Sequence, residues 1–348
     1  MDIQSLTATV RSFRFTDSEK AKHGYKRILI QLFGFLGHGK SSFINSCRYV
    51  MDGGDYVNLA GADSSDAGRT TARISYKLTE DIILVDNRGC STMNSHETGE
   101  IFAQLANLLP LDQEVEWSTG FRLVDRIVDA ETEIQKSDFI FPVFLYSVKK
   151  GIYESDIEDL KQLLDTAKML TGIFPFIVLT HKTHGGMSRI ERQFQDMGAE
   201  RVFALENYTP EDHFKTRGRH EDVLKFFHEI IKEAQFKVEQ VWDPAQGFKE
   251  RKQFVLKFIY EREMKSYRGQ REQKTQAEQT YLVKRLESLK FRSEVQRQED
   301  KRYYDAEMKK IQEQFEDLRR SDALRFETEM KEYQRKLEKA KKNDCNLQ

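Results

Sequence analysis

Eight consecutive residues, 34–41, constrain this chain more than any other part of it. They read Gly-Phe-Leu-Gly-His-Gly-Lys-Ser and fit the pattern G-x-x-x-x-G-K-[ST], a loop whose backbone N–H groups surround the phosphates of a nucleotide. Its glycines let the backbone curl so that successive N–H groups converge on one anion. Its last two residues bring an ammonium to the phosphates and a hydroxyl to Mg²⁺. We expect the phosphate contacts to come from Gly34, Gly37, His38, Gly39, Lys40, Ser41 and Ser42, with Lys40 also catalytic.

The residues on either side of this loop predict the setting that it needs. An apolar run, 27–33, precedes it, and a helix-like stretch, 42–47, follows it. A helix that begins at the loop directs its positive dipole end at the phosphates. Further apolar runs alternate with amphipathic stretches, which favours an α/β fold: a mainly parallel sheet with helices on both faces, as in P-loop NTPases of the GTPase type. The predicted strands are 26–33, 72–78, 82–86, 139–147, 174–180 and 201–205, and the predicted helices are 40–51, 97–109, 155–170, 189–197 and 221–234.

Proline and charge divide the chain into two parts. All five prolines lie at or before Pro244, and the residues from Phe248 onward carry a net charge of +7 against −8 before it. We therefore expect an N-terminal arm (1–24), a GTPase-like domain (25–245), a helical coiled-coil tail (246–342) and a short C-terminal segment (343–348). The positive charges of the tail are interleaved with negative ones, so we expect no nucleic-acid partner.

A second nucleotide-site element follows the apolar run 82–85. Asp86-Asn87-Arg88-Gly89 fits D-x-x-G, in which the carboxylate holds Mg²⁺ and the glycine N–H meets a γ-phosphate. Upstream, Thr70 and Thr71 open the preceding strand, where a switch threonine caps the metal. The sequence thus predicts Mg²⁺ as a cofactor, with Ser41, Thr70, Thr71 and Asp86 as its ligands and Gly89 as a nucleotide contact.

Hydrolysis is predicted to be slow. Cys90 occupies the position after D-x-x-G where small GTPases place a water-orienting glutamine, and a thiol does not replace that amide. Arg69 and Arg88 are placed to approach a γ-phosphate, and we count Arg69 and Thr71 among the catalytic candidates. Acceleration by self-association or by a partner is expected.

Three stretches resemble known immunity-associated GTPases. Ser41-Ser42-Phe43-Ile44-Asn45-Ser46 resembles the helix opening of the interferon-induced protein 44 family. Residues 176–183, Phe-Ile-Val-Leu-Thr-His-Lys-Thr, and 201–207, Arg-Val-Phe-Ala-Leu-Glu-Asn, resemble the base-recognition elements of the GTPases of immunity-associated proteins. The resemblance spans about 25–237 and implies GTP or GDP as the ligand, with Thr180, His181 and Asn207 near the base.

Thr183 departs from that pattern, because the family has a carboxylate there to accept the N1–H and N2–H₂ groups of guanine. A hydroxyl does not supply this charge-assisted pair. Three readings of the site therefore stay open: guanine-specific, adenine-binding or mixed, and without a physiological nucleotide.

The tail carries apolar residues at steps of three and four. The clearest run comprises Met308, Ile311, Phe315 and Leu318, then Phe326, Met330, Tyr333, Leu337 and Ala340, with Asp322 at the intervening seam position. A narrow seam of this kind is typical of helices that pair. We expect it to pair with another chain, giving a homodimer or higher oligomer through the GTPase domain and the coiled coil, or to fold back on the first domain.

The chain ends in Cys345-Asn346-Leu347-Gln348, which fits the C-a-a-X prenylation pattern. Lysines 339, 341 and 342 lie just upstream and add attraction to an anionic surface. This ending is similar to that of some guanylate-binding proteins and implies lipidation at Cys345 and a membrane-surface partner. Three cysteines give no disulfide framework, so we expect a cytoplasmic protein with membrane association.

The sequence therefore predicts a guanine-nucleotide-binding protein, a slow GTPase that acts as an assembly or membrane-associated switch. One alternative is a coiled-coil scaffold whose nucleotide site does not hydrolyse. The other is an ATP-using P-loop enzyme, for which the sequence offers no phosphoacceptor pocket.

Overall fold

The computed structural model describes residues 2–15, 24–61, 72–90, 95–115, 121–239, 243–295 and 301–345. The chain divides into two units, Met1–Ile259 and Tyr260–Gln348. The first unit therefore includes the N-terminal arm and continues past residue 245. Phe248, Val255 and Ile259 are all buried, so a chain cut at residue 245 would lose part of this core.

The first unit is built around a seven-stranded sheet with the order β4-β2-β3-β1-β5-β6-β7. Strands β1, β3, β5, β6 and β7 run parallel, whereas β2 is antiparallel to both β3 and β4. The central strands are almost wholly apolar because helices cover both faces of the sheet. The bounds of the strands are β1 (Arg27–Phe33), β2 (Ala72–Lys77), β3 (Ile82–Asp86), β4 (Gln113–Glu114), β5 (Asp138–Ser147), β6 (Phe176–Thr180) and β7 (Val202–Leu205).

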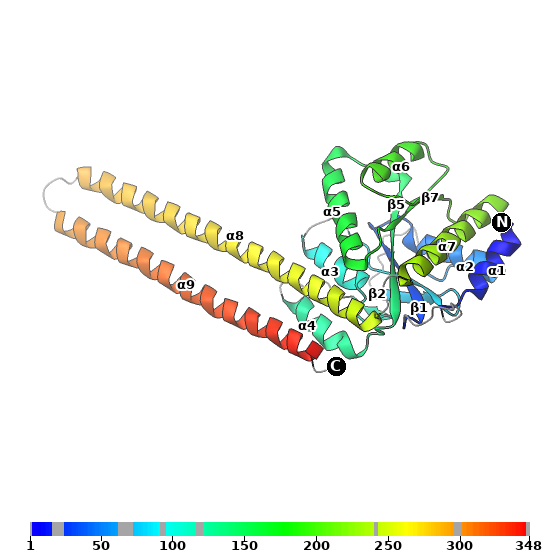
Figure 1. Ribbon diagram of the computed structural model, residues 1–348. Helices are drawn as coiled ribbons and strands as arrows, with labels where there is room; N and C mark the ends of the chain where they lie inside the picture. Colours follow the sequence, from blue (N-terminus) through cyan, green and yellow to red (C-terminus); the bar gives the residue numbers. More distant parts are fainter. Residues whose placement is uncertain are drawn as a thin grey trace. The chain divides into compact units, whose positions relative to one another are not determined.

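Helices lie on both faces of this sheet, as Figure 1 shows. Their bounds are α1 (Ile3–Ser12), α2 (Lys40–Asp52), α3 (Ser95–Leu105), α4 (Arg122–Asp129), α5 (Glu154–Thr171), α6 (Met187–Asp196) and α7 (Arg217–Val238), with short 3₁₀ helices η3 (Ala130–Thr132) and η4 (Val148–Lys150). The fold class predicted from the sequence, an α/β P-loop fold followed by a helical tail, is confirmed. The expected strands and helices all occur, with ends shifted by a few residues, and α1, α4 and β4 are additional.

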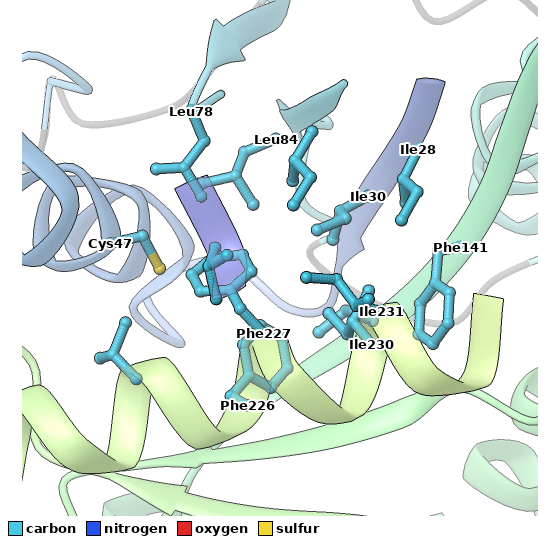
Figure 2. Packing of buried hydrophobic residues seen from close by; sticks show 14 of the residues in the cluster. Ile28, Ile30, Cys47, Leu78, Leu84, Phe141, Phe226, Phe227, Ile230 and Ile231 are labelled. Carbon is cyan, nitrogen blue, oxygen red and sulfur yellow. The ribbon is translucent and has the colours of Figure 1, made fainter. Parts of the chain in front are cut away.

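The larger apolar cluster lies on the face of the sheet covered by α1, α2 and α7. Alternate residues of β1, Ile28 and Ile30, point to this face, whereas Leu29 belongs to a smaller cluster on the opposite face. Figure 2 shows Phe226, Phe227, Ile230 and Ile231 of α7 packed toward the strand residues. Residues three and four apart share one side of a helix. This packing holds β1, and therefore the loop that follows it, in a fixed position.

The second unit is formed by two long helices, α8 (Pro244–Val295, which begins in the first unit) and α9 (Lys301–Cys345). They run antiparallel and side by side (Figure 1). The rings of Tyr267 and Phe326 stack with centroids 5.3 Å apart, and Arg285 lies 3.7 Å from Glu307. The apolar seam of α9 thus contacts α8 of the same chain, which was not among the partners expected from the sequence, and pairing with a second chain stays a prediction.

Among the helical residues that the structure describes, none forms a stretch that is both long enough and apolar enough to cross a bilayer.

Candidate nucleotide-binding site

The loop between β1 and α2 has the backbone conformation that its glycines predict. Gly37 has φ 73° and Gly39 has φ 86°, a region that favours glycine. A Cβ atom at Gly34 would lie 2.5 Å from the Leu145 carbonyl oxygen of β5, so only glycine fits there. Gly39 is the N-cap of α2 and places no side chain over its first turn. The N–H groups at the start of α2 are therefore left for an anion.

Lys40 is held at the centre of this loop. Its side chain is only 6% exposed, and its Nζ donates to the carbonyl oxygens of Gly34 at 3.3 Å and Phe35 at 3.0 Å. Burial lowers the pKa of this ammonium, and the Asp86 carboxylate opposes that shift. A Cβ at Gly89 would lie 2.7 Å from Nζ. The glycine of D-x-x-G thus packs directly against the lysine of the loop.

Ser41 and Asp86 meet beside the lysine. The Ser41 hydroxyl donates to Asp86 Oδ2 at 2.9 Å, and Asp86, at the end of β3, is 2% exposed. Two oxygen ligands beside a phosphate loop suit Mg²⁺, which commonly completes its octahedron with phosphate oxygens and water. The described residues contain no group of three or more His, Cys, Asp or Glu side chains that would form a metal cage. The pair therefore fits a metal that arrives with the nucleotide.

The remaining predicted metal and catalytic residues cannot be placed. Arg69, Thr70 and Thr71 lie outside the described residues. So do residues 346–348 of the C-a-a-X pattern, while Cys345 is described only as the last residue of α9.

Cys90 and Arg88 are both engaged in contacts within the protein. The Cys90 side chain is buried, its Sγ lies 3.8 Å from the Gly34 carbonyl oxygen, and burial raises the pKa of the thiol to about 11. Its carbonyl accepts from the Leu36 N–H at 3.0 Å. Arg88 donates from Nη1 to the Val115 carbonyl at 2.6 Å. In this arrangement Cys90 is bonded to the phosphate loop, and Arg88 joins the D-x-x-G turn to Val115.

His38 acts as a structural support for the loop. Its imidazole is buried against the Tyr146 ring at 4.7 Å, and Nδ1 accepts from the Ser147 N–H at 3.2 Å. Burial, with the nearby positive charge of Lys40, lowers the pKa of His38 to about 3. A neutral ring whose acceptor nitrogen is bonded to β5 supports the conformation of the loop, and His38 as a nucleotide contact stays a prediction.

The residues expected near the base lie against the phosphate loop. Thr180 Oγ1 donates to the His38 carbonyl at 3.1 Å, and Asn207 Nδ2 donates to the Gly39 carbonyl at 3.2 Å. His181 has φ 61°, and its Nδ1 lies 3.1 Å from Ser147 Oγ. The carboxyl ends of four neighbouring strands, β1, β5, β6 and β7, are therefore joined by side-chain bonds.

Sequence reasoning missed a buried polar network beneath D-x-x-G. Arg73 of β2 is fully buried, and its guanidinium donates to the side chains of Asn87 and Asn107 at 3.0 and 2.8 Å and to the carbonyls of Gln104 and Leu109. Burial lowers the pKa of Arg73 to about 9. The network joins the strand after residues 69–71 to the D-x-x-G turn and to α3. The one sign of this network in the sequence was an arginine at the second position of the predicted strand 72–78.

Comparison with known proteins identifies no family. No protein-family model matches the chain, and no curated protein matches it. Among solved structures, one that is similar to this chain is a probable GTP-binding protein EngB, with 14% sequence identity and a TM-score of 0.28 over 60% of this chain and 97% of that one. A likeness at this level carries no argument about the ligand, which is instead argued from the phosphate loop and its neighbours.

Proposed function

We propose that this protein binds a guanine nucleotide with Mg²⁺ and hydrolyses GTP slowly, as a switch that works through self-association or a partner. One observation carries the binding proposal: Lys40 and Ser41 of the phosphate loop and Asp86 and Gly89 of D-x-x-G come from two separate segments and converge within hydrogen-bond or van der Waals reach of one another. A structural Gly-rich turn has no need of a buried lysine beside a serine–carboxylate pair.

Slow turnover is supported by the contacts of three side chains in and beside the phosphate loop. The thiol of Cys90 is buried, the guanidinium of Arg88 bonds to a carbonyl, and the ring of His38 is neutral and packed on β5. Each of the three is therefore already engaged within the protein, and none is a glutamine of the kind that orients water in small GTPases. Positive charge or a water-orienting group then has to come from 69–71, from a second copy of the chain or from another protein, as arginine fingers do.

The same observations favour a second candidate, a scaffold that binds nucleotide without hydrolysing it. The two candidates share the binding site and differ only in turnover. Phosphate release from GTP by the full chain, measured over a range of protein concentrations, separates them. Turnover per molecule that rises with concentration supports the self-activated GTPase, whereas no release at any concentration supports the scaffold.

Calorimetric titration of the full chain with GTP, GDP and ATP in Mg²⁺ tests binding itself. Lys40→Ala removes the ammonium at the phosphates and should weaken binding at least about tenfold, since a hydrogen bond to a charged group contributes roughly 1.5–3 kcal/mol. Lys225→Ala is the matched control, because Lys225 is an exposed lysine of α7 paired with Glu221. Equal affinity in the two variants would remove the phosphate-loop assignment.

A further inference from the structure

The segment after β7, beside the phosphate loop, carries a carboxylate, that of Glu206, which is not among the residues assigned to the nucleotide. Strands β6 and β7 are parallel neighbours, and Thr180 is the register partner of Leu205. The residues that follow them therefore leave the sheet side by side: Thr183 after β6, and Glu206 after β7. Thr180 and Asn207 in the same two segments bond to the phosphate loop, which places this edge next to the nucleotide.

The side chain of Glu206, which follows β7, contacts Thr183, the position at which the resembled family has a carboxylate. The backbone N–H of Thr183 donates to Glu206 Oε2 at 2.8 Å, and the Thr183 hydroxyl donates to the same oxygen at 2.9 Å. Both bonds use Oε2, and Oε1 accepts no hydrogen bond from the residues that the structure describes. The hydroxyl of Thr183 thus serves to hold a carboxylate rather than to contact a base.

The surrounding charges leave this carboxylate able to accept further hydrogen bonds. The ammonium of Lys182, in the same loop as Thr183, is paired with Asp222 at 2.7 Å, and the guanidinium of Arg219 is paired with Asp212 at 2.5 Å. His181 and Arg219 face Glu206 at longer range. Glu206 is half-buried, so a base laid over this edge meets an anionic acceptor that is already oriented.

We propose that Glu206, positioned by Thr183, is the residue that selects guanine at this site, replacing the carboxylate absent from position 183. The inference rests on the proposed function and names its specificity determinant. Guanine presents two adjacent donors, N1–H and N2–H₂, that match a carboxylate. Adenine presents an acceptor at N1, and xanthine an acceptor at position 2, so each places a lone pair against the anion. Buried or oriented polar groups left without a partner are what make such selection strong.

The test is the affinity of the full chain for GDP, XDP and ADP with Mg²⁺, measured by calorimetry for wild type and Glu206→Gln. Wild type should prefer GDP over the other two. In the variant, the amide oxygen still accepts from N1–H, but the amide N–H₂ opposes the guanine amino group and donates to the xanthine oxygen. GDP affinity should fall about tenfold to a hundredfold, and XDP affinity should rise. A gain in XDP affinity cannot arise from misfolding.

Two further variants sharpen this test. Glu211→Gln makes the same chemical change at an exposed position of the next loop and should leave all three affinities unchanged. Thr183→Val keeps the backbone N–H bond to Glu206 and removes the hydroxyl bond, so its GDP loss should be smaller than that of Glu206→Gln.

The outcomes also distinguish this inference from the proposal on which it rests. If wild type binds no diphosphate, the proposed function fails and the inference fails with it. If wild type binds GDP but Glu206→Gln keeps the wild-type ratio of GDP to XDP affinity, the site is a nucleotide site and Glu206 does not read its base.

Discussion

Acid should destabilise the folded protein through His38, and one substitution isolates this effect. The imidazole is 5% exposed and its pKa is lowered to about 3 by burial and by Lys40, Lys150 and His181, whereas the pKa of histidine in an unfolded chain is about 6.5. The folded state therefore binds fewer protons than the unfolded state between these two values. Stability from this group is fully present above pH 6.5 and falls as the pH falls toward 3.

The size of the effect follows from proton linkage. At pH 5 the unfolded histidine is protonated and the folded one is not, which costs about 2 kcal/mol relative to pH 7.5. A folded pKa anywhere below about 4.5 gives nearly the same loss, because the unfolded value then sets the difference. A loss of this size is a large part of the free energy of unfolding of an ordinary domain.

His38→Asn is the informative change, since an amide oxygen can accept from the Ser147 N–H in place of Nδ1 and does not titrate. Urea unfolding followed by near-ultraviolet circular dichroism at pH 7.5 and pH 5 gives the loss for each variant. The loss should be about 2 kcal/mol smaller in His38→Asn than in wild type. His184→Asn, at an exposed position, should behave as wild type. The same loss in His38→Asn and wild type would refute the reasoning.

Three other substitutions test contacts that support the site. Gly89→Ala places a Cβ 2.7 Å from Lys40 Nζ, so GDP affinity measured by calorimetry should fall while folding, followed by circular dichroism, is retained. Arg73→Lys keeps a charge but loses the forked geometry of the guanidinium, and urea unfolding should show a loss of about 3 kcal/mol, as for a broken buried network. Lys252→Met breaks the buried 2.6 Å pair with Glu131 and should lower the free energy of unfolding by about 3 kcal/mol in the same assay. For Arg73→Lys or Lys252→Met, a loss under about 0.5 kcal/mol, as at a surface site, would contradict the prediction.

The phosphate loop and the sheet were predictable because their signals are local. A glycine pattern between an apolar run and a helix determines its own geometry, and the strands around it are continuous apolar runs that have to be buried. Helix α1 was missed for the opposite reason. Its sequence is mixed, and only Leu6 and Val10 are buried, so its helical face is defined by contact with the rest of the unit and not by its own pattern.

The partners of polar side chains were the part of the site that sequence could not supply. Arg73 in a short strand reads as a solvent-facing residue, yet its partners come from α3 and from D-x-x-G, which lie far from it along the chain. Glu206 was visible only as a polar neighbour of Asn207. Its relation to Thr183 depends on the register of β6 and β7, a long-range pairing that single-residue patterns do not encode.

The sequence of the tail likewise did not determine which helix the apolar seam of α9 contacts. Steps of three and four mark a seam on α9, but a seam of this kind looks alike whether it meets a second chain or an earlier helix of its own chain. In the structure the seam meets α8 of the same chain. Asp322, at the seam position that interrupts the apolar repeat, lies 3.9 Å from Lys274 of α8. Ile311 of α9 and Leu282 of α8 are buried. A charge in a seam is favourable only where the opposite helix places the complementary charge at that level, so it selects one register among several. Asp322 therefore favours the register in which it lies beside Lys274 of α8, by the small amount that a partly exposed ion pair contributes.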